Sequence, residues 1–289
     1  MNRLALGTVQ FGLPYGISNK LGQVTRIEAK KMLEIGIESG IDTLDTAINY
    51  GESESYLGEI GIQTFKVVTK LPAIPEDCID VSCWMMSQMK ASLARLAINQ
   101  AYGVLLHHPD QLIGSRGDLI YRGLESLKEK GLIQKIGISI YSPNQIIALT
   151  SKFSFDIVQA PFNVVDQRFY TSGWMKRLKD SGIEIHTRST FLQGLLLMPQ
   201  VNIPIKFSPW NAIWKNWHRW LLNNNISAVQ ASLAFPLSFS EIDRVIVGAD
   251  NVNQLKQILS APNFALKDNH YNFSCEDENL INPMNWFKL

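Results

Sequence analysis

Two spacings of apolar residues alternate along most of the 289-residue chain. Short, almost wholly apolar runs of strand length are followed by longer segments in which apolar residues recur every three or four positions. Eight such runs are interpreted as strands: residues 4–8, 40–45, 65–70, 102–107, 135–140, 156–160, 183–189 and 243–247. Strands that alternate with helices form parallel sheets with right-handed crossovers. The pattern therefore predicts an α/β fold, a (β/α)8 TIM barrel, as a single domain over residues 1–289.

Signals at helix ends agree with this alternation. Thr25, followed three residues later by Glu28, is typical of a capping box, and Gly40 provides the stop for the helix between them. One helix is expected over residues 171–180, which Gly182 ends. A longer helix is expected after Asp80, which can cap it. Its apolar residues have helical spacing and predict packing against the core rather than a cofactor site: Met85, Met89, Leu93 and Leu96.

Two segments interrupt the alternation. Residues 196–226, after the seventh strand, form an insertion with four tryptophans at spacings that place them on one helical face: Trp210, Trp214, Trp217 and Trp220. This helix either packs over the barrel or forms an aromatic wall of the substrate pocket, because loops after barrel strands lie at the active rim. Residues 261–289 are a polar C-terminal tail that either docks over the pocket or frays.

Composition narrows the functional classes. The net charge of +1 gives no electrostatic reason to expect nucleic acid or an anionic membrane as a partner. No apolar run approaches the roughly 20 residues of a membrane span. Cys78, Cys83 and Cys275 are few, odd in number and lack the CxxC spacing, so we expect reduced thiols, a cytoplasmic protein and no metal site.

Four polar side chains follow three successive strand-like runs. Asp45, Lys70 and His107 each close a run, and Tyr50 comes five residues after Asp45. In a parallel barrel these positions meet at one rim. Alone, each residue has an ordinary interpretation as a solvated strand end, a packed ring or a buried histidine. Their conjunction at one rim indicates a catalytic site instead.

The chemistry of this group is acid–base catalysis on a carbonyl compound. A lysine ammonium beside the Tyr50 phenol is expected to lower its pKa, and a carboxylate such as Asp45 holds the lysine charged. The His107 imidazole can hydrogen-bond a carbonyl oxygen or relay a proton. No residue can itself donate hydride, so the reaction requires a nicotinamide cofactor.

The same motifs resemble the aldo-keto reductase superfamily. Residues 40–50, 67–70 and 105–110 carry the resemblance, and further similar stretches extend it over nearly the whole chain: residues 6–12, 124–131, 136–139, 158–163 and 247–249. The resemblance implies that Tyr50 is the general acid, Lys70 and Asp45 its pKa partners and His107 the orienting group. It also implies the cofactor contacts: Thr8 near the nicotinamide ribose, Ser139 and Gln159 at the carboxamide, Arg188 at the nicotinamide ring, and Gly248, Ala249, Asp250 and Gln254 at the adenosine end.

Three positions depart from the family pattern. Ile140 stands where an asparagine is frequent, which removes one expected carboxamide contact, and Gly103 stands where an aspartate is frequent. Arg188 replaces an aromatic ring that stacks on the nicotinamide. A guanidinium can also stack on a ring, but it repels the positively charged oxidised nicotinamide. We therefore expect tighter binding of the reduced cofactor.

The resemblance favours NADPH, with NADH as a second cofactor. The stretch after the eighth strand, residues 248–256, has amides at the start of a helix but no cation before Lys256, and Asp250 adds a like charge. We expect both cofactors to bind, with an NADPH advantage below about a hundredfold.

These observations predict an NAD(P)H-dependent oxidoreductase that reduces an aldehyde, ketone or sugar carbonyl, or runs the reverse oxidation. A first alternative is a nucleotide-binding regulatory or scaffold subunit with little turnover, which would not need Tyr50 and Lys70. A second is a lyase or isomerase that uses Lys70 as a Schiff base. That chemistry needs an unpaired, neutral lysine, and Asp45 opposes it.

Overall fold

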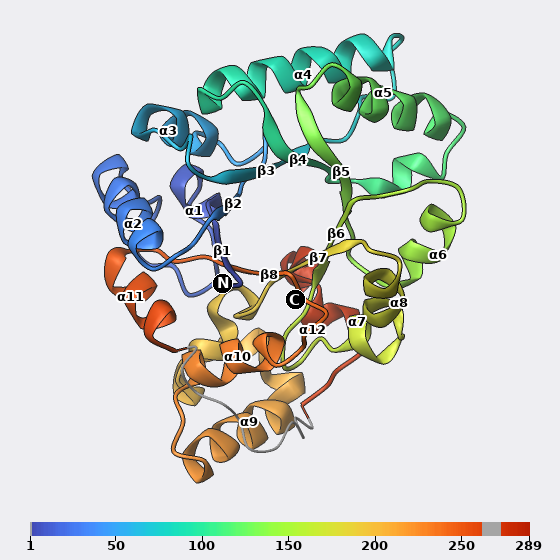
Figure 1. The fold of residues 1–289 in the computed structure, drawn as a ribbon. Coiled ribbons are helices and arrows are strands. Elements are labelled where there is room, and N and C mark those ends of the chain that lie inside the picture. The colour runs from blue at the N-terminus through green and yellow to red at the C-terminus, as the bar shows by residue number, and fades with distance from the viewer. Residues whose placement is uncertain (1, 262–272) are drawn as a thin grey trace.

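Eight parallel strands close into a barrel in sequence order, as the alternation predicted (Figure 1). The structure is a computed structural model that describes residues 2–261 and 273–289. The strands are β1 (Leu4–Gly7), β2 (Thr43–Asp45), β3 (Lys66–Leu71), β4 (Ala101–Leu106), β5 (Ile133–Ser139), β6 (Ile157–Pro161), β7 (Glu184–Arg188) and β8 (Arg244–Val247). Closure of the barrel pairs β1 with both β2 and β8, so the first and last strands of the chain lie side by side.

Helices surround the barrel and cover the outer face of its strands (Figure 1). They are α1 (Val9–Gly12), α2 (Arg26–Glu38), α3 (Ser53–Ile60), α4 (Val81–Leu96), α5 (Gly117–Glu129), α6 (Asn144–Thr150), α7 (Arg168–Thr171), α8 (Trp174–Asp180), α10 (Ala228–Leu237) and α11 (Val252–Ser260). The sequence predicted one helix over residues 171–180. That boundary is wrong, because Gly173 adopts a positive φ of 75° and separates α7 from α8.

The main core lies between the barrel and the helices. The four residues of α4 that were predicted to pack are buried in it, which confirms that they are packing residues: Met85, Met89, Leu93 and Leu96. A small separate cluster of Val68, Leu105 and Ile157 comes from β3, β4 and β6. A Cβ at Gly103 would lie 2.8 Å from Cδ1 of Ile157, so a larger residue there would require the Ile157 side chain to shift.

A charged network occupies the end of the barrel where the strands begin. Glu184, the first residue of β7, accepts hydrogen bonds from the Tyr102 hydroxyl at 2.8 Å and from Lys135, and its other oxygen lies 2.8 Å from Nε2 of His186. Together these contacts hold the pKa of Glu184 well below its usual range, although burial alone would raise it. They tie β4, β5 and β7 together at the end opposite the candidate site.

The tryptophan-bearing insertion folds beside the barrel. It comprises η2 (Leu192–Leu197), η3 (Gln200–Asn202), η4 (Ile205–Trp210) and α9 (Asn211–Asn223), and α9 lies outward of α10 (Figure 1). Trp214 and Trp217 are buried, and their indole N–H groups donate to the carbonyls of Phe207 at 3.1 Å and Leu196 at 3.0 Å. These contacts are those of a packed helix.

The described part of the C-terminal tail docks against this insertion and against the rim of the barrel. It contains α12 (Glu278–Ile281) and η6 (Pro283–Lys288), and the Trp286 ring packs 4.9 Å from that of Phe207. The backbone N–H of Cys275 donates to the carbonyl of Val165 at 2.9 Å. Arg168 pairs with Asp166 and with Glu278. The tail residues 262–272 lie outside the described residues.

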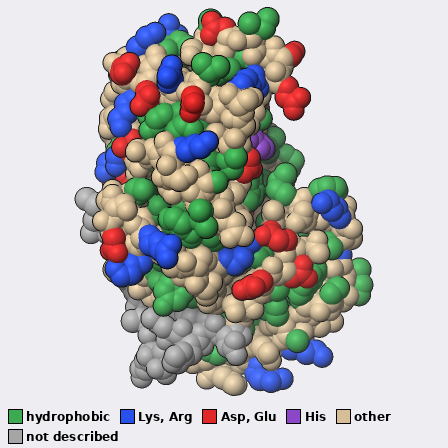
Figure 2. Space-filling view, turned by 90° about the vertical axis from the view of Figure 1, so that its right-hand side faces the viewer, with side chains coloured by type: hydrophobic (Ala, Val, Ile, Leu, Met, Phe, Trp, Pro, Cys, Tyr) green, Lys and Arg blue, Asp and Glu red, His purple; other side chains and the backbone are tan. Residues whose placement is uncertain are grey.

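The surface carries both signs of charge. Figure 2 shows Lys and Arg side chains interspersed with Asp and Glu on one face, as the net charge of +1 suggests. Within residues 2–261 and 273–289, every helix is too short or too polar to cross a bilayer.

Candidate active site

A buried ion pair stands at the rim where the strands end. Asp45 is the last residue of β2 and Lys70 the next to last of β3, and their side chains are 7% and 1% exposed. Lys70 Nζ lies 2.7 Å from Asp45 Oδ2 and donates to the carbonyl of Thr46 at 2.8 Å. Burial lowers the pKa of Lys70, and the Asp45 carboxylate opposes this by raising it.

Tyr50 and His107 face this pair. The Tyr50 ring centroid is 5.0 Å from Lys70 Nζ, and the His107 ring meets the Tyr50 ring edge-on at 6.0 Å. His107 directly follows β4, and its backbone N–H donates to the carbonyl of Leu71 at 3.1 Å. The structure therefore brings all four predicted residues together.

Close packing fixes the turn that carries Tyr50. A Cβ at Gly12 would collide with the Tyr50 carbonyl oxygen, so α1 can rest on this turn only with glycine at that position. Gly51 has a positive φ of 53° and lies against the Gly12 carbonyl in the same way. The two glycines thus set the place of the Tyr50 phenol relative to the rim.

The pKa of Tyr50 is shifted in the direction opposite to the one that the sequence predicted. Burial raises the pKa of Tyr50, Asp45 raises it further and Arg188 lowers it, so the net shift is upward rather than the expected decrease. The Lys70 charge, which was expected to lower it, is paired with Asp45. Burial, followed by Lys70 and Arg188, lowers the pKa of His107 to about 3. At neutral pH the phenol is protonated and the imidazole is neutral.

Ser139 and Gln159 line the buried side of the site. Gln159 Nε2 donates to Asp45 Oδ1 at 2.7 Å, and Ser139 Oγ donates to Gln159 Oε1 at 3.3 Å. Both side chains are buried; Ser139 is the last residue of β5 and Gln159 the middle residue of β6. A chain of contacts therefore runs from Ser139 through Gln159 and Asp45 to Lys70.

Arg188 ends β7 at the same rim. Its guanidinium donates to the carbonyl of Ile140 at 3.0 Å and to Ser189 Oγ at 3.3 Å, and stacks 4.7 Å from the Tyr141 ring centroid. No carboxylate pairs with it within the part of the chain that the structure describes. The sequence did not point to Tyr141, because a ring in a loop has no periodic signal.

Thr8 is buried, and its hydroxyl is engaged within the chain. Thr8 Oγ1 lies 2.8 Å from Ser53 Oγ and donates to the carbonyl of Asp45 at 3.1 Å. These bonds hold the end of β1 against the start of α3 and the end of β2. The Thr8 side chain thus stabilises the backbone segments that carry the site.

The residues predicted at the adenosine end follow β8. Gly248 and buried Ala249 lead to Asp250, whose N–H donates to Gln254 Oε1 at 2.8 Å, while Gln254 Nε2 donates to Asp250 Oδ2 at 3.4 Å. The expectation that the amides at the start of this helix are available is wrong for two of them. The N–H of Val252 donates to Glu28, and that of Gln254 to Asn251.

Loops from remote parts of the sequence meet over the rim. Gln193 Nε2 donates to the Tyr15 hydroxyl at 3.1 Å, and the Gln193 carbonyl accepts from the N–H of Ile17 at 3.1 Å. Asn19 donates to Asp250 Oδ1 at 3.3 Å. The loops after β1, β7 and β8 are thereby joined. Contacts between loops leave no sequence pattern, so these residues were not predicted.

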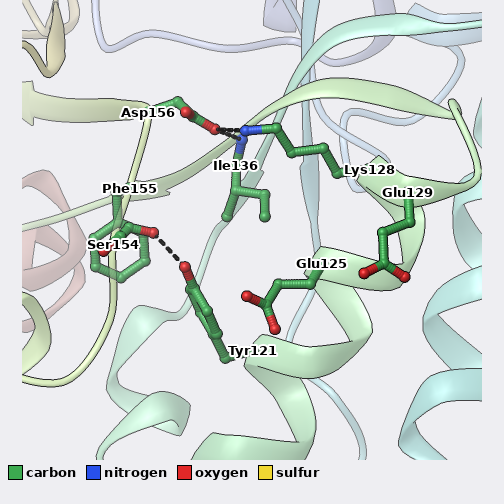
Figure 3. Close-up of a pocket in the computed structure, with 8 residues that line it drawn as sticks. All are labelled: Tyr121, Glu125, Lys128, Glu129, Ile136, Ser154, Phe155 and Asp156. Carbon is green, nitrogen blue, oxygen red and sulfur yellow. Dashed lines mark hydrogen bonds and ion pairs between the residues drawn. The ribbon is translucent and has the colours of Figure 1, made fainter.

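A separate recess of about 290 Å³ lies on the outside of the barrel, between α5 and the segment that enters β6 (Figure 3). Two contacts join polar groups of its lining: the Tyr121 hydroxyl donates to the carbonyl of Ser154 at 2.7 Å, and Lys128 pairs with Asp156 at 2.6 Å. None of the four rim residues lines this recess. It has no part in the candidate chemistry.

Known proteins share this chain's sequence and fold. The chain is 26% identical to the uncharacterized oxidoreductase YqkF of Bacillus subtilis over 257 residues, which is 82% of each chain. It is 26% identical to the oxidoreductase sirO of Leptosphaeria maculans over 218 residues, 72% of this chain but only 65% of that relative. The solved holo form of the aldo-keto reductase AKR11C1 from Bacillus halodurans shares the fold, with a TM-score of 0.76, 20% identity and coverage of 93% of this chain and 90% of that one.

The sequence profile described as the aldo/keto reductase family matches residues 3–273. This match begins before β1 and ends after α11, so it includes every strand of the barrel and every residue of the candidate site. The protein is therefore a member of the aldo/keto reductase family.

Proposed function

We propose that this protein reduces the carbonyl group of a small aldehyde, ketone or sugar to an alcohol, with Tyr50 as the proton donor. The family carries out NAD(P)H-dependent carbonyl reduction, which sets the reaction class. The observation that supports the roles of individual residues is the gathering of Tyr50, His107 and the buried Lys70–Asp45 pair at one rim. An acid, its charged partner and a neutral orienting group are what this reaction needs.

The residues present fit a nicotinamide dinucleotide. When bound, it supplies the hydride. The buried hydroxyl of Ser139 and amide of Gln159 can hydrogen-bond a carboxamide beside Asp45. Gln10 lies against Gly248, and its buried Oε1 lacks a hydrogen-bond partner within the described residues. An unmet acceptor at the end of β8 is consistent with a ligand that passes there.

Tyr50 gives its proton to the substrate oxygen as the carbonyl carbon becomes tetrahedral. The proton is present because burial and Asp45 raise the pKa of the phenol. The phenolate left behind faces the Lys70 ammonium, which is stabilised as a cation by Asp45. His107, neutral because its pKa is about 3, can donate one hydrogen bond to the same substrate oxygen and orient it. Its neutrality makes Tyr50 rather than His107 the acid.

The raised pKa of Tyr50 also favours one direction. Reduction starts from the protonated phenol, whereas alcohol oxidation needs the phenolate as a base. We therefore infer that reduction is the faster direction at neutral pH. The lyase or isomerase alternative is disfavoured, because a Schiff base requires a free lysine and Lys70 is bound to Asp45 and Thr46.

The decisive experiment follows NADH and NADPH oxidation with a panel of aldehydes, ketones and sugars. Tyr50→Phe should lower turnover by at least about a hundredfold, the usual scale for a lost general acid, while nucleotide affinity stays the same. Tyr170→Phe, at an exposed tyrosine, is the matched control. Near-normal turnover in Tyr50→Phe would remove Tyr50 from the mechanism. Nucleotide binding without oxidation by any carbonyl class would favour the regulatory or scaffold alternative.

A further inference from the structure

A carboxylate from α2 occupies the start of α11. Glu28 lies in the first turn of α2, where its N–H donates to Thr25 Oγ1 at 3.3 Å, as the sequence predicted. The Glu28 side chain, however, reaches away from Thr25, and its Oε1 accepts a hydrogen bond from the N–H of Val252 at 2.7 Å. Val252 is the first residue of α11. More than two hundred positions separate the partners, and the β1–β8 pairing brings them together.

A second carboxylate stands at the same helix end. Asp250 precedes α11, and its oxygens accept from Asn19 at 3.3 Å and from Gln254 at 3.4 Å. Both bonds are long, so each oxygen keeps capacity for a stronger donor. The N–H of Gln254 is already taken by the Asn251 side chain at 2.9 Å. An anion that approached this helix end would therefore find two carboxylates, and two of the amides there are already engaged.

These two carboxylates lack an ion-pair partner in the part of the chain that the structure describes. Of the ion pairs among the described residues, none joins Glu28 or Asp250 to a lysine or arginine. Burial raises the pKa of Asp250, and only its contact with Gln254 lowers it. A phosphate monoester carries up to about two negative charges at neutral pH and needs cations or free amides to balance them.

A third acceptor lies nearby. Gln10 on α1 is 9% exposed, and its buried Oε1 lacks a hydrogen-bond partner within the described residues. The same amide rests on Gly248, where a Cβ would stand 2.5 Å from Nε2. An unmet buried acceptor costs free energy until a donor reaches it. A hydroxyl group can be that donor, and an ionised phosphate cannot.

We propose that this end of the site, lined by Glu28, Asp250 and Gln10, receives the adenosine ribose of the cofactor with both hydroxyls free, so that the protein selects NADH over NADPH. The inference rests on the proposed function, because it concerns the cofactor of that reaction. Carboxylates accept hydrogen bonds from a ribose diol and repel a 2′-phosphate. Glu28 is the specificity residue: it supplies a negative charge and removes the Val252 amide from anion binding. The order of preference is thus the reverse of the one expected from the sequence.

Equilibrium binding tests the inference without turnover. Dissociation constants for NADH and NADPH are measured by quenching of tryptophan emission and by calorimetry. The unmodified protein should bind NADH at least about tenfold more tightly, the scale of one charged interaction. Glu28→Ala removes the charge and frees the amide, so it should tighten NADPH binding by about tenfold or more, whereas NADH, which loses a hydrogen-bond acceptor for its ribose, should gain nothing.

Two further variants separate charge from folding. Glu28→Gln keeps the acceptor and loses the charge, so it should give a smaller gain for NADPH, and that gain should shrink as salt is added. Glu34→Ala removes an exposed glutamate of the same helix and should change neither constant. Thermal melting of each variant shows whether it remains folded.

Nucleotide fragments locate the effect. If the adenosine end is responsible, 5′-ADP should compete with NADH better than 2′,5′-ADP does, and Glu28→Ala should remove the difference. Tighter NADPH binding by the unmodified protein, unaltered in Glu28→Ala, would overturn the inference and leave the proposed function standing. Failure to bind either dinucleotide would overturn the proposed function itself, and the inference with it.

Discussion

Lys70 and Asp45 form a buried ion pair between neighbouring strands, with 2.7 Å between Nζ and Oδ2. The carbonyl of Thr46 and the amide of Gln159 complete the hydrogen bonding of the pair. Two charges that leave water together are tolerated only when each is compensated in this way. The pair is therefore both a part of the candidate catalytic site and a stability-determining feature of the barrel.

Breaking this pair should destabilise the protein strongly. Asp45→Asn leaves Lys70 without a counter-charge, so we expect the free energy of unfolding to fall by about 3–5 kcal/mol. Asp180→Asn breaks the exposed Lys176–Asp180 pair and should leave the free energy of unfolding nearly unchanged. Urea denaturation at neutral pH measures both. Equal effects of the two variants would show that the buried pair does not stabilise the fold.

The pH dependence of stability should carry a contribution from His107. Its pKa is about 3 in the folded protein, below the value of about 6.5 expected when unfolded. As the pH falls below about 6.5, the unfolded state binds a proton that the folded state does not, so stability is lost until the pH nears 3.

His107→Asn should remove this part of the pH dependence. The denaturation midpoints at pH 7.5 and pH 5 should then lie closer together than those of the unmodified protein. The carboxylates are the same in both proteins. His108→Asn, at the exposed neighbour, should leave the difference as it was. If His107→Asn also leaves the difference between the two midpoints unchanged, the fold does not hold the imidazole neutral.

Truncation of Trp217 should affect stability rather than substrate choice. The indole is buried and donates to the carbonyl of Leu196 at 3.0 Å, so Trp217→Ala should cost about 3–5 kcal/mol of unfolding free energy. Leu222→Ala, at a residue of α9 that is 80% exposed, is the control and should be nearly neutral. Altered substrate preference with unchanged stability would instead place α9 at the pocket.

Arg188 should discriminate between the redox states of the cofactor. Its guanidinium, which pairs with no carboxylate among the described residues, lies close enough to Lys70 and His107 to lower the pKa of both, and it would repel an oxidised nicotinamide. Arg188→Gln should lower the ratio of the dissociation constants for oxidised and reduced cofactor by roughly tenfold. Arg188→Lys should preserve most of that ratio, and Arg177→Gln, at an exposed arginine, all of it. A ratio unaffected by Arg188→Gln would place the ring beyond the reach of this charge.

The barrel and the four rim residues could be predicted from the sequence because their signals are local. Strand and helix periodicities are read within a few residues, and parallel closure brings every strand end to the same rim. Asp45, Lys70 and His107 could therefore be predicted as site residues from their positions at the ends of apolar runs alone. The helix split at Gly173 was missed, since nothing local showed that this glycine would adopt a positive φ.

What the tertiary structure decided depends on distances between residues remote in sequence. The upward shift in the pKa of Tyr50 follows from how deeply the phenol is buried and from the pairing of Lys70 with Asp45, neither of which is a local property. The contact of Glu28 with Val252 exists only because β1 and β8 close the barrel. Sequence periodicity determined which elements form and where their side chains emerge. Closure of the chain determined which charges meet there, and hence the protonation states at the rim and the carboxylates at the end where we propose that the adenosine ribose binds.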